Sequence, residues 1–85
     1  MSFDETIVTT KEELRNFNIE QELNSICDDL KEIGYEPKTQ IISYLISGDP
    51  GYISSYNDCR NRITEFKREE IIEAMIDKFI DRWYH

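Results

Sequence analysis

The side chains that most often perform chemistry are few in this sequence and stand far apart. Its single histidine, His85, is the last residue, and its two cysteines, Cys27 and Cys59, fall in separate parts of the chain. A zinc site needs closely spaced Cys or His ligands, and a nucleophilic serine needs a histidine beside it. The carboxylates fall on the polar faces of predicted helices, where solvated acids are poor acid-base catalysts. We therefore expect no catalytic residue, no metal site and no cofactor, and a protein that is not an enzyme.

Four cationic side chains gather in one short stretch of an otherwise acidic chain: Arg60, Arg62, Lys67 and Arg68. Arginine favours bidentate pairing with carboxylate or phosphate. This stretch is therefore the best candidate for a surface that binds a partner's acids or a phosphothreonine. The alternative is a solvated helix face with ordinary salt bridges. On one helix Arg60 and Lys67 can share a face, whereas Arg60 and Arg62 cannot.

Thr6 is the other candidate for chemistry, as an acceptor of phosphate. It follows Asp4 and Glu5 in a segment with few apolar residues, and accessible tails are what kinases bind. Residue types alone favour an unmodified polar threonine.

Length and charge limit what these residues can belong to. The chain has 85 residues, with 18 Asp and Glu against 10 Lys and Arg, a net charge of −8. A chain this short forms a single domain with a small core, which self-association would stabilise. The negative charge disfavours binding to nucleic acid and to anionic membranes. Since there is no signal peptide, no apolar stretch long enough to span a bilayer and no CxxC motif, we expect a cytoplasmic protein with reduced thiols.

The first seventeen residues predict a flexible N-terminal regulatory tail, because their apolar residues fit neither a helix nor a long strand. Thr10 and Glu13 nevertheless match a capping box, which leaves open a turn that begins near Lys11.

Residues 18–85 predict a compact all-α domain of four to five helices that carries dimerisation and partner binding. Asn18 is the expected N-cap of the first helix, and Gly34 and Gly48 are expected stops. Apolar residues at steps of three and four predict helices over residues 18–33, 38–47, 57–66 and 67–83.

The last predicted helix has more apolar residues than one stripe of a small monomer can bury. A homodimer interface on this helix is the simplest explanation, and a wholly buried central helix is the alternative. The interface residues would be Ile72, Met75, Ile76, Phe79, Ile80 and Trp83.

A helix-turn-helix nucleic-acid binder is a competing functional class. The helix over 38–47, the corner at Gly48 and the following helix suggest it, whereas the net charge argues against it.

Several motifs resemble the IreB/ReoM family of small bacterial regulatory phosphoproteins. They are FDET at 3–6, GYEP at 34–37, SGDPGYI at 47–53, YNDCRN at 56–61 and REEI at 68–71. The resemblance implies a cytoplasmic all-helical homodimer whose N-terminal tail is phosphorylated by a membrane Ser/Thr kinase with PASTA domains and dephosphorylated by its phosphatase. It also implies control of peptidoglycan synthesis and of resistance to wall-targeting antibiotics. In some bacteria this control works through adaptor or protease-pathway proteins, by Clp-dependent proteolysis of an enolpyruvyl transferase.

The resemblance places the phosphoacceptor at Thr6, within the motif DET. The family's preceding threonine has no counterpart here, so a second modification would have to use Ser2, Thr9 or Thr10. It also implies a partner-binding set: Asn57, Arg60, Asn61 and Arg68.

The basic face is thinner than in relatives, because Ser55 and Thr64 stand where relatives often have arginine. Phosphorylation of Thr6 adds about −1.5 to −2 charges. We hypothesise that this phosphate docks on the surface of Arg60 and Arg68 and releases a partner that uses it.

Overall fold

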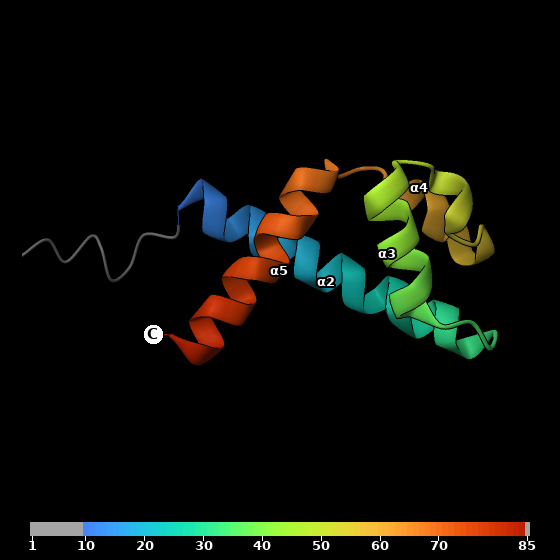
Figure 1. Cartoon of the computed structure of the whole chain (residues 1–85), viewed down its shortest axis with the longest axis horizontal. Coiled ribbons are helices and arrows are strands. Elements are labelled where there is room, and N and C mark those ends of the chain that lie inside the picture. Colours follow the sequence, from blue (N-terminus) through green and yellow to red (C-terminus); the bar gives the residue numbers. More distant parts are fainter. Residues whose placement is uncertain (1–9, 85) are drawn as a thin grey trace, which may run out of the picture.

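The computed structural model describes residues 10–84, and every regular element in that range is helical (Figure 1). The predicted all-α class is confirmed. Four α-helices and two 3-10 turns follow one another as α2 (Lys11–Glu32), α3 (Pro37–Ser47), η1 (Pro50–Tyr52), η2 (Tyr56–Asp58), α4 (Cys59–Ile63) and α5 (Arg68–Trp83).

The capping box at Thr10 starts the longest helix, α2. The Thr10 hydroxyl accepts from the backbone N–H of Glu13, and the Glu13 carboxylate accepts from the backbone N–H of Thr10, each at 3.0 Å. The predicted start at Asn18 is therefore wrong, and α2 begins at Lys11, as the capping box allowed. The part of the predicted tail before Thr10 lies outside the described residues.

Polar contacts explain why the apolar spacing missed the first turns of α2. Leu14 and Phe17 stay 54% and 56% exposed, so they give no buried stripe. Instead, Arg15 donates to Glu73 at 3.0 Å, and Asn16 donates to Asp77 at 2.9 Å, both on α5. These hydrogen bonds to α5 hold the segment in place, and the spacing of apolar residues in the sequence cannot predict them.

The ends of α2 and α3 follow the predicted signals. Gly34 and Gly48 both have a positive φ, +86° and +79°, which only glycine adopts without strain. Asp49 then accepts from the backbone N–H of Gly51 at 2.8 Å and starts the turn η1. The corner predicted between two helices is present, but it leads into a 3-10 turn.

The helix predicted over 57–66 is broken, which is a correction. Asn57 and Asp58 have φ of 49° and 62°, and only Cys59–Ile63 forms the α-helix α4. Cys59 and Ile63 nevertheless point into the core, and both are fully buried.

The molecule is elongated, 49 × 23 × 23 Å. Helix α5 crosses the N-terminal half of α2, while α3 and α4 lie near the C-terminal end of α2 (Figure 1). The other three α-helices thus all pack against α2. The core consists of Ile19, Ile26, Leu30, Ile41, Tyr44, Ile53, Cys59, Ile63, Ile71 and Ala74.

Candidate functional site

The structure leaves all four predicted partner-binding residues exposed, and we call them the Asn–Arg surface: Asn57, Arg60, Asn61 and Arg68. The backbone holds the two arginines in place. Arg60 donates from Nε to the carbonyl of Ile53 at 2.8 Å, and Arg68 donates to the carbonyl of Leu45 at 3.0 Å.

Neither arginine of this surface forms an ion pair with a carboxylate among residues 10–84. Among the described residues only Nε of Arg60 has a hydrogen-bond acceptor, so its two terminal nitrogens are available to an anion. The expectation that Arg60 and Lys67 share one helical face is wrong, since Arg60 lies on α4 and Lys67 precedes α5.

Gly48 makes room for the guanidinium of Arg68. A Cβ on Gly48 would lie 2.9 Å from the Arg68 Cζ, so any side chain there would displace it. The guanidinium also caps the C-terminus of α3, where a cation is favoured by the helix dipole. Gly48 thus serves the surface through Arg68 as well as through its own φ.

Arg62, which the sequence grouped with the other cations, belongs to the interior side of α4. Its side chain is 20% exposed, and it pairs with Glu22 and with Asp29, the latter at 2.7 Å. The hydrogen bond from Arg62 holds the pKa of Asp29 below its usual value. The two carboxylates favour the charged guanidinium and raise the pKa of Arg62. Sequence spacing could not reveal this, because both acids lie far away on α2.

Helix α5 exposes the predicted dimer residues on one broad face. Ile72 and Met75 are each 42% exposed and Trp83 is 64% exposed, while only Ile71 and Ala74 of this helix are buried. The alternative of a wholly buried central helix is therefore wrong. Beyond its crossing with α2, the C-terminal end of α5 extends away from α3 and α4 (Figure 1), and Phe79 and Trp83 near this end are 54% and 64% exposed.

An apolar groove of about 360 Å³ continues this face toward α3. Met75 belongs to both, and Cys27 lies at the groove wall on α2. Burial raises the pKa of the Cys27 thiol, so it stays protonated at neutral pH, in keeping with its role as an apolar wall residue.

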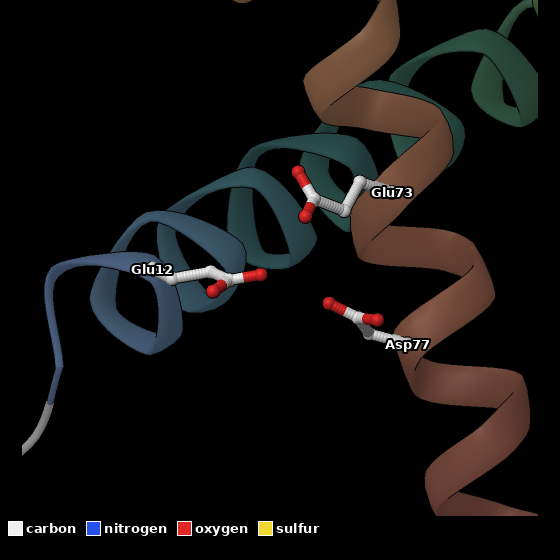
Figure 2. Close-up of side chains that lie close together, drawn as sticks. All are labelled: Glu12, Glu73 and Asp77. Atoms are coloured by element: carbon white, nitrogen blue, oxygen red, sulfur yellow. The ribbon is translucent and has the colours of Figure 1, made fainter.

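Three carboxylates meet where α2 crosses α5, at Glu12, Glu73 and Asp77 (Figure 2). Their oxygens lie within 4.8 Å of one another, and all three residues are exposed. Arg15 offsets part of the charge through its 3.0 Å contact with Glu73. This cluster could not be predicted from residue spacing, because the two helices that form it are far apart in the chain.

Substituting Glu73→Gln is expected to stabilise the protein at neutral pH. Glu12 beside it raises the pKa of Glu73 in the folded protein above the value of about 4.5 in the unfolded chain. The folded state therefore holds this proton more strongly, and the free energy of unfolding of the wild type falls as the pH rises from the unfolded to the folded pKa. Gln removes this loss and can still accept from Arg15. The melting temperature of Glu73→Gln should therefore be higher than that of the wild type at pH 7, and the two should converge near pH 4.

The matched control is Glu65→Gln, which removes the same charge at an exposed position outside the cluster. An equal gain in both variants would mean that lower net charge, and not the cluster, accounts for the effect.

Thr6 lies outside the described residues, as do Ser2 and Thr9. Thr10 is exposed, but its hydroxyl oxygen caps α2. Of the predicted tail, the structure describes only residues 10–17, which cap and begin α2.

Comparison with known families supplies the observation that decides the identity. The family model described as IreB regulatory phosphoprotein matches residues 4–81, which is nearly the whole chain. The chain belongs to the IreB regulatory phosphoprotein family. The matched range of this IreB-family chain includes Thr6, the Asn–Arg surface and most of α5. The resemblance inferred from the motifs is confirmed, and with it the general role of a regulatory phosphoprotein.

Proposed function

We propose that this chain is a non-catalytic switch phosphorylated on Thr6 by a PASTA-domain Ser/Thr kinase and reset by the cognate phosphatase. It acts in the cytoplasm through protein-protein contacts that tune peptidoglycan synthesis and resistance to wall-targeting antibiotics. The route is Clp-dependent proteolysis of the enolpyruvyl transferase. The family match, which covers both Thr6 and the Asn–Arg surface, is the observation that supports this proposal.

The contacts of Arg15 limit where a phosphorylated tail can dock on the same chain. Arg15 lies 4.0 Å from the Glu70 carboxylate, which also accepts from the backbone N–H of Lys67 at 3.2 Å. These contacts bring the start of α5 beside the first turns of α2. Thr6 precedes Thr10 by four residues, a span of at most about 14 Å. This span does not reach Arg60, because α4 packs on α2 at Glu22 and Asp29, about 18 Å or more from Thr10 along the helix. Docking in the same chain therefore concerns Arg68 at the start of α5.

A homodimer through α5 is part of the proposal. Monomeric proteins rarely expose apolar patches beyond a few hundred Å². The face of α5 exposes six large apolar side chains and adjoins an apolar groove, and a second copy would cover both.

The nucleic-acid alternative has less support. Helix α4, which follows the corner at Gly48, has only five residues, and one of its two arginines pairs with acids of α2.

No helix within residues 10–84 combines the length and apolar content needed to cross a bilayer.

Phosphorylation by the purified kinase domain tests the switch. Mass spectrometry should place the phosphate on Thr6, and Thr6→Ala should lose at least nine tenths of the incorporation, because a kinase cannot modify a residue without a hydroxyl. Pull-downs with Thr6→Ala and Thr6→Glu should then recover different partners.

Thr9→Ala is the matched control, since it removes a neighbouring threonine while Thr10, which caps α2, stays in place. Undiminished phosphate incorporation in Thr6→Ala would remove the assigned site. Identical partners for all variants would remove the switch.

A further inference from the structure

The Arg62 guanidinium connects three groups of α2 to the turn before α4. Its Nε donates to Glu22, one terminal nitrogen donates to Asp29 at 2.7 Å, and the other donates to the hydroxyl of Ser25 at 2.7 Å. The nitrogen that contacts Asp29 also donates to the backbone carbonyl of Asn57 at 3.0 Å. Arg62 thus fixes one peptide group of the turn to the long helix.

The turn needs such a restraint because its backbone is unfavourable. Asn57 and Asp58 are consecutive residues with positive φ. Residues other than glycine rarely adopt this conformation, and among them Asn and Asp tolerate it best. Helix α4 has five residues, too few to be stable by itself. The turn and α4 therefore depend on contacts with α2 for their conformation.

The same turn determines where the Asn–Arg surface points. Asn61 donates to the Asp58 carboxylate at 2.9 Å, and Arg60 lies between them on the exposed side of α4. Arg62 projects to the opposite side, into the acids of α2. Its donors are already engaged, which leaves anion binding to its neighbours.

We infer that Arg62 is a positioning residue: with Asp29 it holds the Asn57–Asp58 turn in place and so presents the Asn–Arg surface to a phosphate-bearing ligand. This inference rests on the proposed docking function of that surface. Arg62 touches no ligand itself and acts through the turn.

Two pairs of variants of the full chain test the inference. Arg62→Met is compared with Lys67→Met, since each removes one positive charge from the same stretch. Asp29→Ala is compared with Asp28→Ala, since each removes one negative charge from α2, and Asp28 forms no ion pair with a described residue. The probe is a synthetic peptide of residues 1–9 phosphorylated on Thr6, with binding followed by fluorescence anisotropy.

Arg62→Met and Asp29→Ala should each weaken peptide binding about tenfold, whereas both controls should stay within about threefold of wild type. Asp29→Ala is the most informative variant. Removing an acid from the protein reduces its repulsion of a phosphate and by itself would strengthen binding. Weaker binding by Asp29→Ala would therefore show that Asp29 acts by holding the turn in place.

A second measurement does not depend on the peptide. In NMR spectra the strong intraresidue amide-to-Hα cross-peaks that mark a positive φ at Asn57 and Asp58 should weaken in Arg62→Met and Asp29→Ala and persist in both controls. Unchanged cross-peaks in both variants would overturn the inference. So would a lost turn with unchanged peptide affinity. Failure of the wild type to bind the peptide would instead overturn the docking function, and the presenting role of Arg62 with it.

Discussion

Replacing Ile76 by glutamate should abolish the proposed homodimer through α5. Ile76 is 51% exposed at the centre of the apolar face of α5, where a second copy would bury it. An unpaired charge buried in an interface costs about 3 kcal/mol or more, which raises the dissociation constant at least about a hundredfold. Sedimentation equilibrium across a range of concentrations measures the change directly.

The control for this substitution is Ile46→Glu on α3. Ile46 is 79% exposed, so it carries the same chemistry on a helix outside the predicted interface. This variant should remain as dimeric as the wild type. A wild type that sediments as a monomer at high concentration would refute the α5 interface, and dissociation by both variants would place the contact on a wider surface.

Gly48→Ala should lower the free energy of unfolding by about 2–3 kcal/mol. A left-handed conformation costs a non-glycine residue about 1–2 kcal/mol, and the displaced Arg68 would lose a hydrogen bond worth about 1 kcal/mol. The new Cβ would meet the Arg68 guanidinium at 2.9–3.1 Å. Urea denaturation followed by circular dichroism gives the loss.

Gly34→Ala separates the two contributions. Gly34 has a similar φ of +86°, but a Cβ there would meet nothing within 4 Å. It should therefore cost only the conformational part, about 1–2 kcal/mol. Equal losses at the two glycines would show that Arg68 adjusts without cost and that Gly48 matters only for its backbone.

The parts of the fold that were predicted correctly depend on local signals. Gly34, Pro37 and Gly48 mark helix ends by their own backbone preferences, and the apolar spacing of α5 gave its limits to within one residue. These signals need no knowledge of distant residues.

The parts that were missed depend on contacts between distant residues. The first turns of α2 are held by hydrogen bonds from Arg15 and Asn16 to α5, and Arg62 pairs with acids that lie 33 and 40 positions away. The break before α4 was missed for a different reason. The adjacent Asn57 and Asp58 tolerate a left-handed backbone, but they also occur inside helix starts, so residue type alone does not decide between the two.

The fixed start of α2 has a consequence for the strength of the switch. Because Thr10 starts α2 and Glu12 lies beside Glu73 and Asp77 of α5, a phosphate on Thr6 would be attached four residues from the helix that crosses α5, and its docking on the same chain would have an effective concentration in about the millimolar range. Intramolecular docking could then be half-complete even if the isolated phosphopeptide binds with only millimolar affinity. A phosphate on Thr6 would therefore not need a high-affinity site on this protein in order to compete with a partner for the same surface.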